Sequence, residues 1–312
     1  MPHLQFVTLD VFTSSPFTGN PLVIIFLSDD SNPSQEQKQN IAREFNLSET
    51  LFIHDSKDKK RRIDIFTTEC EIPFAGHPTI GAATWCLQHS TKQVDHEVDT
   101  LITKSGEIPI SLSSKGDGKV SARVAHNVRI HGSAFPNSEL LRLHPSLGPY
   151  VKDAKSTFPI FSIVNGMSQV HVELPSLSAM EAVTTAAGGE ILYGDKCMYL
   201  DEGWRNGLVI LYFYVRDVAD PQSGKKVIRT RAILGNLEDP ATGSAASGLA
   251  SYLSLMEGRA GEYQYDIVQG VEMGRRSEIG IGVTVNGETK IETVELKGSA
   301  VKVSEGSIVL PE

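Results

Sequence analysis

The sequence has only three cysteines, Cys70, Cys86 and Cys197, and they lie far apart. Cysteines at these spacings form neither a disulfide framework nor the paired pattern of a zinc site. They fit a reducing compartment, so we expect a cytoplasmic protein. The chain also lacks long apolar runs. The longest, such as 22–27, are far shorter than the roughly 20 residues of a membrane-spanning helix. We therefore expect no membrane partner and no signal peptide.

Positive charge is also in short supply. The 29 Lys and Arg residues face 38 Asp and Glu residues, and the formal net charge is −9. A negative field of this kind repels phosphate backbones, so we expect no nucleic-acid partner. The only dense basic run is 57–62 (KDKKRR), which we interpret as a solvated hairpin turn.

The familiar cofactor and catalytic motifs are missing as well. The sequence contains no GxGxxG, no GxxxxGK followed by Ser or Thr, no HExxH and no GxSxG. Nothing in it therefore points to a dinucleotide, to a nucleoside triphosphate, to a catalytic metal or to a serine nucleophile on an elbow turn.

Short strands dominate what is present. A chain of 312 residues is long enough for two domains. Alternating or apolar runs such as 6–12, 62–67 and 208–216 predict strands along the whole length. Helices are few. One is predicted from Ser34 to Phe45, where Ser34 and Gln37 have the spacing of a capping box.

Two further helices are predicted from Pro78 to about His89 and from Pro240 to about Met256. Both begin near a proline and are small and apolar on nearly every side, which is typical of buried helices. Aligning Thr79 with Thr242 also matches several small residues that follow. The pattern favours two copies of one unit, each a curled antiparallel sheet around a central helix. Chance similarity of two alanine-rich helices is the alternative.

The starts of these two helices are candidate binding sites. The free N–H groups of a first helical turn bind anions, so Gly76 and His77 at the first start could contact a carboxylate. His77 could equally satisfy only its own turn. At the second start, Asp239 is placed to cap the helix. Thr242, Gly243 and Ser244 follow it with the hydroxyls and close backbone amides that hold a carboxylate.

Glu49 is a candidate acid/base. It stands at a corner between the first predicted helix and a strand, within Asn46-Leu47-Ser48-Glu49-Thr50. A carboxylate beside an apolar pocket has a raised pKa and can both take and give a proton near neutrality. The alternative from the residues alone is an exposed glutamate in a loop.

Five motifs, in this order along nearly the whole chain, resemble the phenazine-biosynthesis-like (PhzF-type) isomerase family, which has the diaminopimelate epimerase fold. They are Asp10-Val11-Phe12 with Phe17-Thr18-Gly19-Asn20-Pro21, Asn46 to Thr50, Phe74-Ala75-Gly76-His77-Pro78-Thr79-Ile80-Gly81, Glu238-Asp239-Pro240-Ala241-Thr242-Gly243-Ser244-Ala245, and Gln269-Gly270 with Met273-Gly274-Arg275. Arg276 departs from the pattern, since many relatives have proline there.

The resemblance implies an α+β fold of two similar domains. Each is a barrel-like, mostly antiparallel sheet wrapped around a central buried helix. The domains would be residues 1–128 plus 299–312 and residues 129–298, with the last strand returning to the first domain and the active site in the cleft between them. The resemblance also implies no cofactor and often a homodimer. We expect no metal site.

The resemblance further implies that Glu49 is the acid/base. It implies substrate contacts at Gly76 and His77 from the first helix start and at Asp239, Gly243 and Ser244 from the second. The hydroxyl of Thr242 makes this residue a further candidate contact. We expect His77 and Asp239 to stabilise the shifted charge or to assist the proton transfer. We expect a cofactor-independent isomerase that shifts a proton on a small acidic substrate. Two alternatives stay open on the same site: an amino-acid racemase or epimerase, and a secondary-metabolite cyclase. A ligand-binding protein without catalysis is a third.

Some members of this fold are racemases that use two thiols, one at each helix start. Here the two starts read Ala75-Gly76-His77 and Glu238-Asp239-Pro240, without a cysteine. A single-base shuttle therefore fits the sequence better than a two-thiol racemase.

Overall fold

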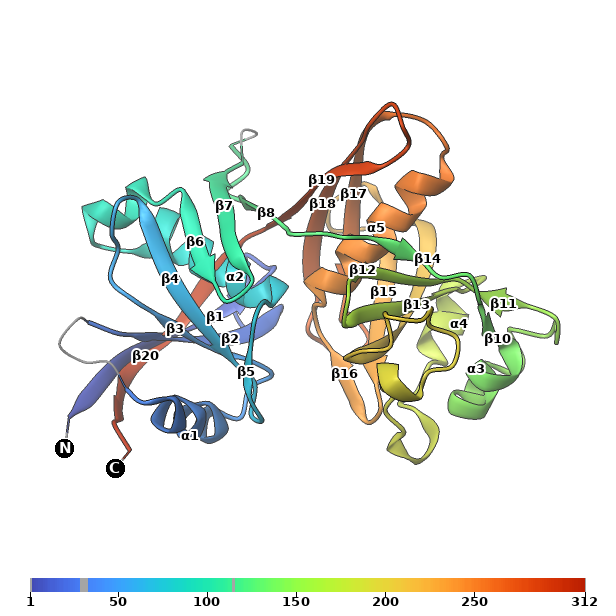
Figure 1. The fold of residues 1–312 in the computed structure, drawn as a ribbon, viewed down its shortest axis with the longest axis horizontal. Helices are drawn as coiled ribbons and strands as arrows, with labels where there is room; N and C mark the ends of the chain where they lie inside the picture. The colour runs from blue at the N-terminus through green and yellow to red at the C-terminus, as the bar shows by residue number, and fades with distance from the viewer. Residues whose placement is uncertain (1, 29–32, 114–115, 312) are drawn as a thin grey trace. The chain divides into compact units, whose positions relative to one another are not determined.

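The computed structural model describes residues 2–28, 33–113 and 116–311 (Figure 1). Most of these residues lie in or between strands, and the helices are few. The predicted mixed fold, rich in strands and poor in helices, is confirmed. The chain divides into two compact units, one of residues 1–124 with 296–312 and the other of residues 125–295. Within the described part of the chain, no helix has the length and apolar character needed to cross a membrane.

The first unit is built mainly from strands. They are β1 (His3–Val11), β2 (Asn20–Phe26), β3 (Thr50–Ile53), β4 (Lys60–Phe66), β5 (Glu71–Ile72), β6 (Thr100–Thr103), β7 (Gly106–Leu112), β8 (Val120–Arg123) and β20 (Ala300–Val309). β1 is antiparallel to both β2 and β20, so the C-terminal strand lies beside the N-terminal one. β3 continues the sheet parallel to β2, and β4 follows antiparallel to β3.

Helix α1 (Gln35–Phe45) packs on one face of this sheet. Both hydrogen bonds of the predicted capping box are present: Gln37 N–H donates to Ser34 Oγ at 3.2 Å, and Ser34 N–H donates to Gln37 Oε1 at 2.9 Å. Ile41 and Ala42 are buried against a cluster from β1 to β4 that includes Phe52. This packing holds α1 against the sheet, and the last residue of the helix lies four positions before Glu49.

Helix α2 (Gly76–Thr84) is buried along its whole length. It contacts β1, β2, β3, β8 and β20, and a five-residue π-helical segment, Trp85–His89, continues it. Gly81 shows why its residues are small, because a Cβ there would stand 2.3 Å from a methyl carbon of Leu22. The helix begins two residues before the predicted Pro78. A short 3-10 turn, Gln93–Glu97, follows.

The basic run 57–62 forms a tight turn, but the prediction that it is solvated throughout is wrong for Arg61. Asp58 and Lys59 have positive φ values between Lys57 and Lys60, which bridge the turn. Arg61 is buried instead, and its Nη1 lies 3.3 Å from Oδ2 of the buried Asp95. The alternation of the β4 strand turns this one side chain inward.

The second unit also consists mainly of strands. They are β9 (Arg129–Ile130), β10 (Phe135–Pro136), β11 (Thr157–Phe158), β12 (Ile160–Val164), β13 (Met167–Glu173), β14 (Leu208–Ala219), β15 (Lys226–Leu234), β16 (Leu237–Asp239), β17 (Gly261–Gln269), β18 (Ser277–Val285) and β19 (Ile291–Gly298), which runs past the unit boundary. β14 lies between β13 and β15, and β15 also pairs with β16 and β17.

The helices of the second unit are α3 (Asn137–Leu143), α4 (Leu177–Glu181) and α5 (Gly243–Met256), with short 3-10 turns at Pro145–Leu147, Ala187–Gly189 and Gly194–Lys196. α5 contacts β12, β13, β17 and β18. We predicted that it begins at Pro240, but it begins at Gly243. The reason is that Asp239 is still paired in β16, so the chain needs three residues to turn from strand into helix.

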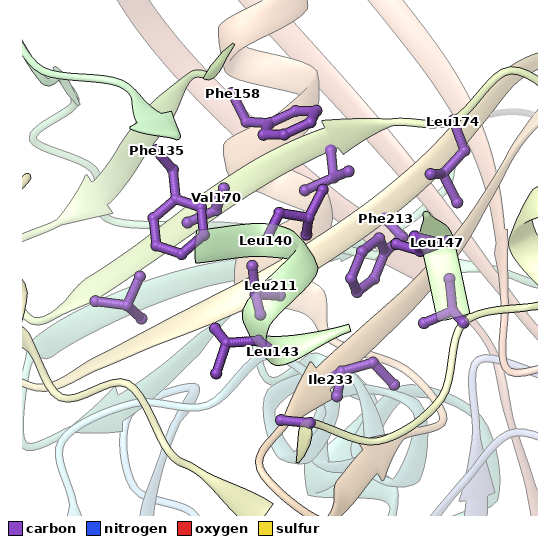
Figure 2. Close-up of a cluster of buried hydrophobic side chains, with 14 of the residues drawn as sticks. Phe135, Leu140, Leu143, Leu147, Phe158, Val170, Leu174, Leu211, Phe213 and Ile233 are labelled. Carbon is purple, nitrogen blue, oxygen red and sulfur yellow. The ribbon is translucent and has the colours of Figure 1, made fainter. Parts of the chain in front are cut away.

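The core of the second unit lies between α3 and the face of β13, β14 and β15 (Figure 2). Leu140 and Leu143 of α3 meet Phe213 of β14 and Ile233 of β15. Each such fully buried side chain contributes roughly 1.5–3 kcal/mol of hydrophobic stabilisation. This core holds β15, whose hairpin partner β16 carries Asp239.

Candidate active site

Glu49 occupies the short link between α1 and β3. Helix α1 ends at Phe45, and its C-cap residue Asn46 has the left-handed φ of 50° and donates its N–H to Ala42 O. Four residues later Thr50, fully buried, enters β3. The Glu49 side chain is 19% exposed, so it is neither an open loop residue nor a sealed core residue.

The surroundings of Glu49 favour its protonated form. Burial raises the pKa of the Glu49 carboxyl above the ordinary value, and a hydrogen bond with the Ser48 side chain offsets part of that rise. A carboxyl group with a raised pKa can act as a base and as an acid near neutral pH. This is the electrostatic condition that we expected for a proton shuttle.

His77 lies directly against Glu49. It is the second residue of α2, and its side chain is only 4% exposed. Its Nδ1 is 3.6 Å from Glu49 Oε2, which is longer than a direct hydrogen bond. The structure thus brings together two of the three predicted catalytic residues.

The start of α2 carries no side-chain cap. Its N-cap is Ala75, and the Thr79 hydroxyl donates back to Ala75 O at 2.7 Å instead of turning to the first-turn amides. Gly76 is the first helical residue and is buried beside His77. The first turn of α2, at Gly76 and His77, therefore receives no side-chain cap from its N-cap residue, and anion binding there stays a prediction.

The second predicted group of residues lies together in the second unit. Thr242 Oγ1 donates to Asp239 Oδ2 at 2.6 Å, and Ala241 N–H donates to Asp239 Oδ1 at 3.4 Å. Thr242 is the N-cap residue of α5, so Asp239 does not hold the N-cap position that we predicted for it. Gly243 is the buried first residue of α5, and Ser244 follows it half-buried.

Gln269 organises this turn, and sequence reasoning gave it no role. Its side-chain N–H groups donate to Asp239 O at 2.7 Å and to Thr242 Oγ1 at 3.0 Å. Its Oε1 accepts from Thr242 N–H and from the Tyr212 hydroxyl. The only sequence signal was its place in the motif that begins at Gln269. Nothing in the sequence said that a residue 27 positions after Thr242 would hold it.

The next residue explains why the motif continues with glycine. Gly270 has a φ of +73°, and a Cβ there would stand 2.7 Å from Pro240 O and 2.6 Å from Arg275 O. The loop after β17 is therefore pressed against the turn that leads into α5. Arg276, the departure from the family pattern, makes a bidentate ion pair with the buried Asp220, with both N–O distances 2.9 Å.

Comparison with known proteins gives the family. Residues 9–306 match the model of the phenazine biosynthesis-like protein family. A trans-2,3-dihydro-3-hydroxyanthranilate isomerase of Pseudomonas chlororaphis is 32% identical over 311 residues, which cover 98% of this chain and 99% of the relative. An uncharacterized isomerase of Mesorhizobium japonicum is 29% identical and covers 99% of this chain and 100% of the relative.

Solved structures agree with this assignment. The Bacillus anthracis phenazine biosynthesis protein of the PhzF family superposes with a TM-score of 0.73 at 21% identity, covering 99% of this chain and 100% of that chain. A probable proline racemase from Agrobacterium radiobacter shares the fold with a TM-score of 0.59 at 11% identity, covering 99% and 93%. The chain thus shares its fold with a phenazine biosynthesis protein and with a probable proline racemase. The chain belongs to the phenazine biosynthesis-like family, a family of enzymes, as the motifs predicted.

Proposed function

We propose that this protein is a cofactor-independent isomerase that moves a proton on a small carboxylate-bearing substrate, with Glu49 as the general acid/base. The observation that carries the proposal is the pair of Glu49 and His77: a carboxyl group with a raised pKa, 3.6 Å from a buried imidazole at a helix start. The family and its relatives named as isomerases support the same class of reaction.

In the proposed reaction the Glu49 carboxylate takes a proton from a carbon next to an electron-withdrawing group. The electron pair of the broken C–H bond shifts along the substrate, and Glu49 returns the proton to another carbon. His77 assists by stabilising the charge that develops during the transfer. No oxidant or reductant is needed, because substrate and product have the same composition.

We further propose that the two helix starts supply the anion-binding groups. Gly76 would act at α2, and Thr242, Gly243 and Ser244 at α5, with Asp239 assisting the proton transfer. The amide ends of helices favour negative charge, and both helices begin without a side-chain cap of their own N-cap residue. We also propose that the protein is a homodimer and that it is located in the cytoplasm.

The relatives suggest a first substrate to test. Proteins 32% identical to this chain are named trans-2,3-dihydro-3-hydroxyanthranilate isomerases. We propose a substrate of this general kind, a small unsaturated acid. The racemase alternative through two thiols is less well supported. Cys86 and Cys197 are buried, and burial raises the pKa of both thiols, to about 11 for Cys86, which disfavours the reactive thiolate.

The experiment is the isomerisation of trans-2,3-dihydro-3-hydroxyanthranilate by wild type and by Glu49→Gln, which keeps the size of the side chain but cannot carry the proton. We expect kcat to fall by about 100-fold or more. The matched control is Glu44→Gln, on the exposed face of α1 five residues earlier, which should leave kcat unchanged. Isomerisation by Glu49→Gln at the wild-type rate would disprove the role of Glu49.

A second measurement separates the readings that share this site. Turnover in deuterated water shows whether the product carries solvent deuterium or the original hydrogen. Retention of the original hydrogen supports internal return by one base.

A third measurement tests the non-catalytic alternative. If a broad panel of small acids raises the unfolding temperature but none is converted, the protein is a ligand-binding member of the family rather than an enzyme.

A further inference from the structure

The connection between β1 and β2, residues 12–19, contains two phenylalanines with left-handed backbone conformations. Phe12 has a φ of 64° and Phe17 a φ of 66°. Bulky residues rarely adopt this region, because Cβ crowds the backbone there. Phe17 also follows Pro16 in a turn, at a position where positive φ favours Gly or Asn. Phe17 therefore occupies a backbone conformation that is unfavourable for an aromatic residue.

Core packing accounts for Phe12 but not for Phe17. The Phe12 ring is fully buried and contacts Gly298, where a Cβ would stand 2.5 Å from the ring. The burial of this ring therefore offsets the strained backbone. Phe17 is 74% exposed, so its ring gains almost nothing from the fold. Strained residues of this kind concentrate at functional sites.

Hydrogen bonds that do not involve the Phe17 ring hold the loop in place. The buried Asp10 carboxylate accepts the Phe17 N–H at 2.6 Å. The Thr18 hydroxyl bonds to Thr13 Oγ1 at 2.6 Å and donates to Ser15 O at 2.7 Å. The backbone at residue 17 is thus fixed by its neighbours, and the ring is presented outward as a consequence.

The strand register places this loop at the same end of the sheet as Glu49. Val23 of β2 lies beside Thr50 of β3, and the two strands are parallel, so the residue before β3 lies near the start of β2. Asn20, where the loop enters β2, is therefore within about 10 Å of the Glu49 backbone. The exposed Phe17 thus belongs to the loop that enters the sheet at the end where Glu49 precedes β3.

We propose that Phe17 is a substrate-binding residue that determines specificity: its exposed ring packs against a flat, unsaturated part of the substrate on which Glu49 acts. The inference rests on the proposed function for the identity of the reacting group. Aromatic rings gain most from contact with planar apolar partners. The Phe17 ring can make such a contact at little entropic cost, because the backbone of the loop is already fixed.

The test uses substitutions that suit the backbone but remove the ring. Asn and Gly both tolerate positive φ, so Phe17→Asn and Phe17→Gly should each fold. The unfolding temperature of each variant should equal or exceed that of wild type. The probe is 3-hydroxyanthranilate, a stable planar acid, with Kd measured by calorimetry. We expect both variants to bind it about tenfold more weakly, because each loses the aromatic contact.

Two comparisons sharpen the result. Phe17→Tyr keeps a ring and should bind the probe within about threefold of wild type, since most of the contact surface is retained. Val94→Asn removes another exposed apolar side chain of the same unit, 59% exposed, and should change nothing. With the true substrate, Phe17→Asn should raise KM and leave kcat nearly unchanged, a split that a loss of fold would not produce.

The inference is overturned if wild type does not bind the probe, if Phe17→Asn binds it as wild type does, or if Phe17→Asn is clearly less stable. A change confined to the oligomeric state, without a change in Kd, overturns it as well, since the ring would then serve a subunit contact. Measuring the same Kd values in a Glu49→Gln background separates the two proposals, because binding to Phe17 does not require proton transfer.

Discussion

The Thr242 hydroxyl donates its hydrogen to Asp239, and Gln269 determines that direction. Thr242 Oγ1 lies 2.6 Å from Asp239 Oδ2 and also accepts an N–H of Gln269 at 3.0 Å. Because the Gln269 amide is a donor at this point, the Thr242 hydrogen is directed to the carboxylate. Asp239 is thereby held as a hydrogen-bond acceptor in one orientation.

This relationship predicts that Gln269 is a positioning residue. Gln269→Leu removes two donors and an acceptor from the turn before α5, so we expect kcat/KM to fall by about tenfold to 100-fold while the chain stays folded. Thr242→Val should cause a similar loss, whereas Thr242→Ser, which keeps the hydroxyl, should recover most of the activity. Steady-state kinetics with circular dichroism checks this. Equal activity of Thr242→Val and Thr242→Ser would refute it.

Glu49 should lower the stability of the fold at high pH. Burial raises the pKa of the Glu49 carboxyl in the folded state. The stabilisation that comes from its protonated form is therefore fully present below the ordinary pKa of 4.5, and it is lost as the pH rises through the higher pKa of the folded state. Glu49→Gln removes that loss. We expect it to unfold about 2 °C higher than wild type at pH 8 and at the same temperature at pH 4. Thermal unfolding across this range is the measurement.

The exposed Glu44→Gln supplies the control for that experiment, since its side chain faces solvent. The difference between Glu44→Gln and wild type should stay constant with pH. A stabilisation by Glu49→Gln that is the same at pH 4 and pH 8 would show that burial of the charge is not its cause.

The buried ion pair of Lys38 and Asp64 should be essential for the docking of α1. Lys38 Nζ lies 2.6 Å from Asp64 Oδ2, and both side chains are buried. Burial alone would raise the pKa of Asp64, but hydrogen bonds from His54 and Lys38 outweigh it and hold that pKa well below the ordinary value. Asp64→Asn leaves the Lys38 charge buried and unpaired, so we expect a loss of about 3 kcal/mol in the free energy of unfolding.

Urea unfolding at pH 7 measures that loss. The exposed pair of Lys60 and Glu107 is the control, and Glu107→Gln should change the free energy of unfolding by less than about 0.5 kcal/mol. The stabilisation from Asp64 should persist down to its ordinary pKa of 3.8 and disappear as the pH falls further. A loss from Asp64→Asn as small as the control would refute the prediction.

Much of the local structure was predictable from the sequence. The capping box at Ser34 and Gln37 signalled the start of α1, because both partners lie within one helical turn. The buried helices were recognisable because they are apolar on every side. Their first residues were less predictable: α5 starts three residues late because the pairing of Asp239 with Ala232 extends β16, and a partner strand leaves no mark in the helix sequence.

The candidate site divides in the same way. The sequence by itself determined which residue types are available: Glu49 at a chain corner, His77 and Gly76 at one helix start, Asp239 to Ser244 before another, and the motifs that identify the family. Only the tertiary structure decided that Glu49 and His77 lie 3.6 Å apart, that Gln269 holds Thr242, and that Phe17 remains exposed. These relationships join residues far apart in the chain. Burial and hydrogen-bond direction depend on such neighbours, and local sequence does not specify them.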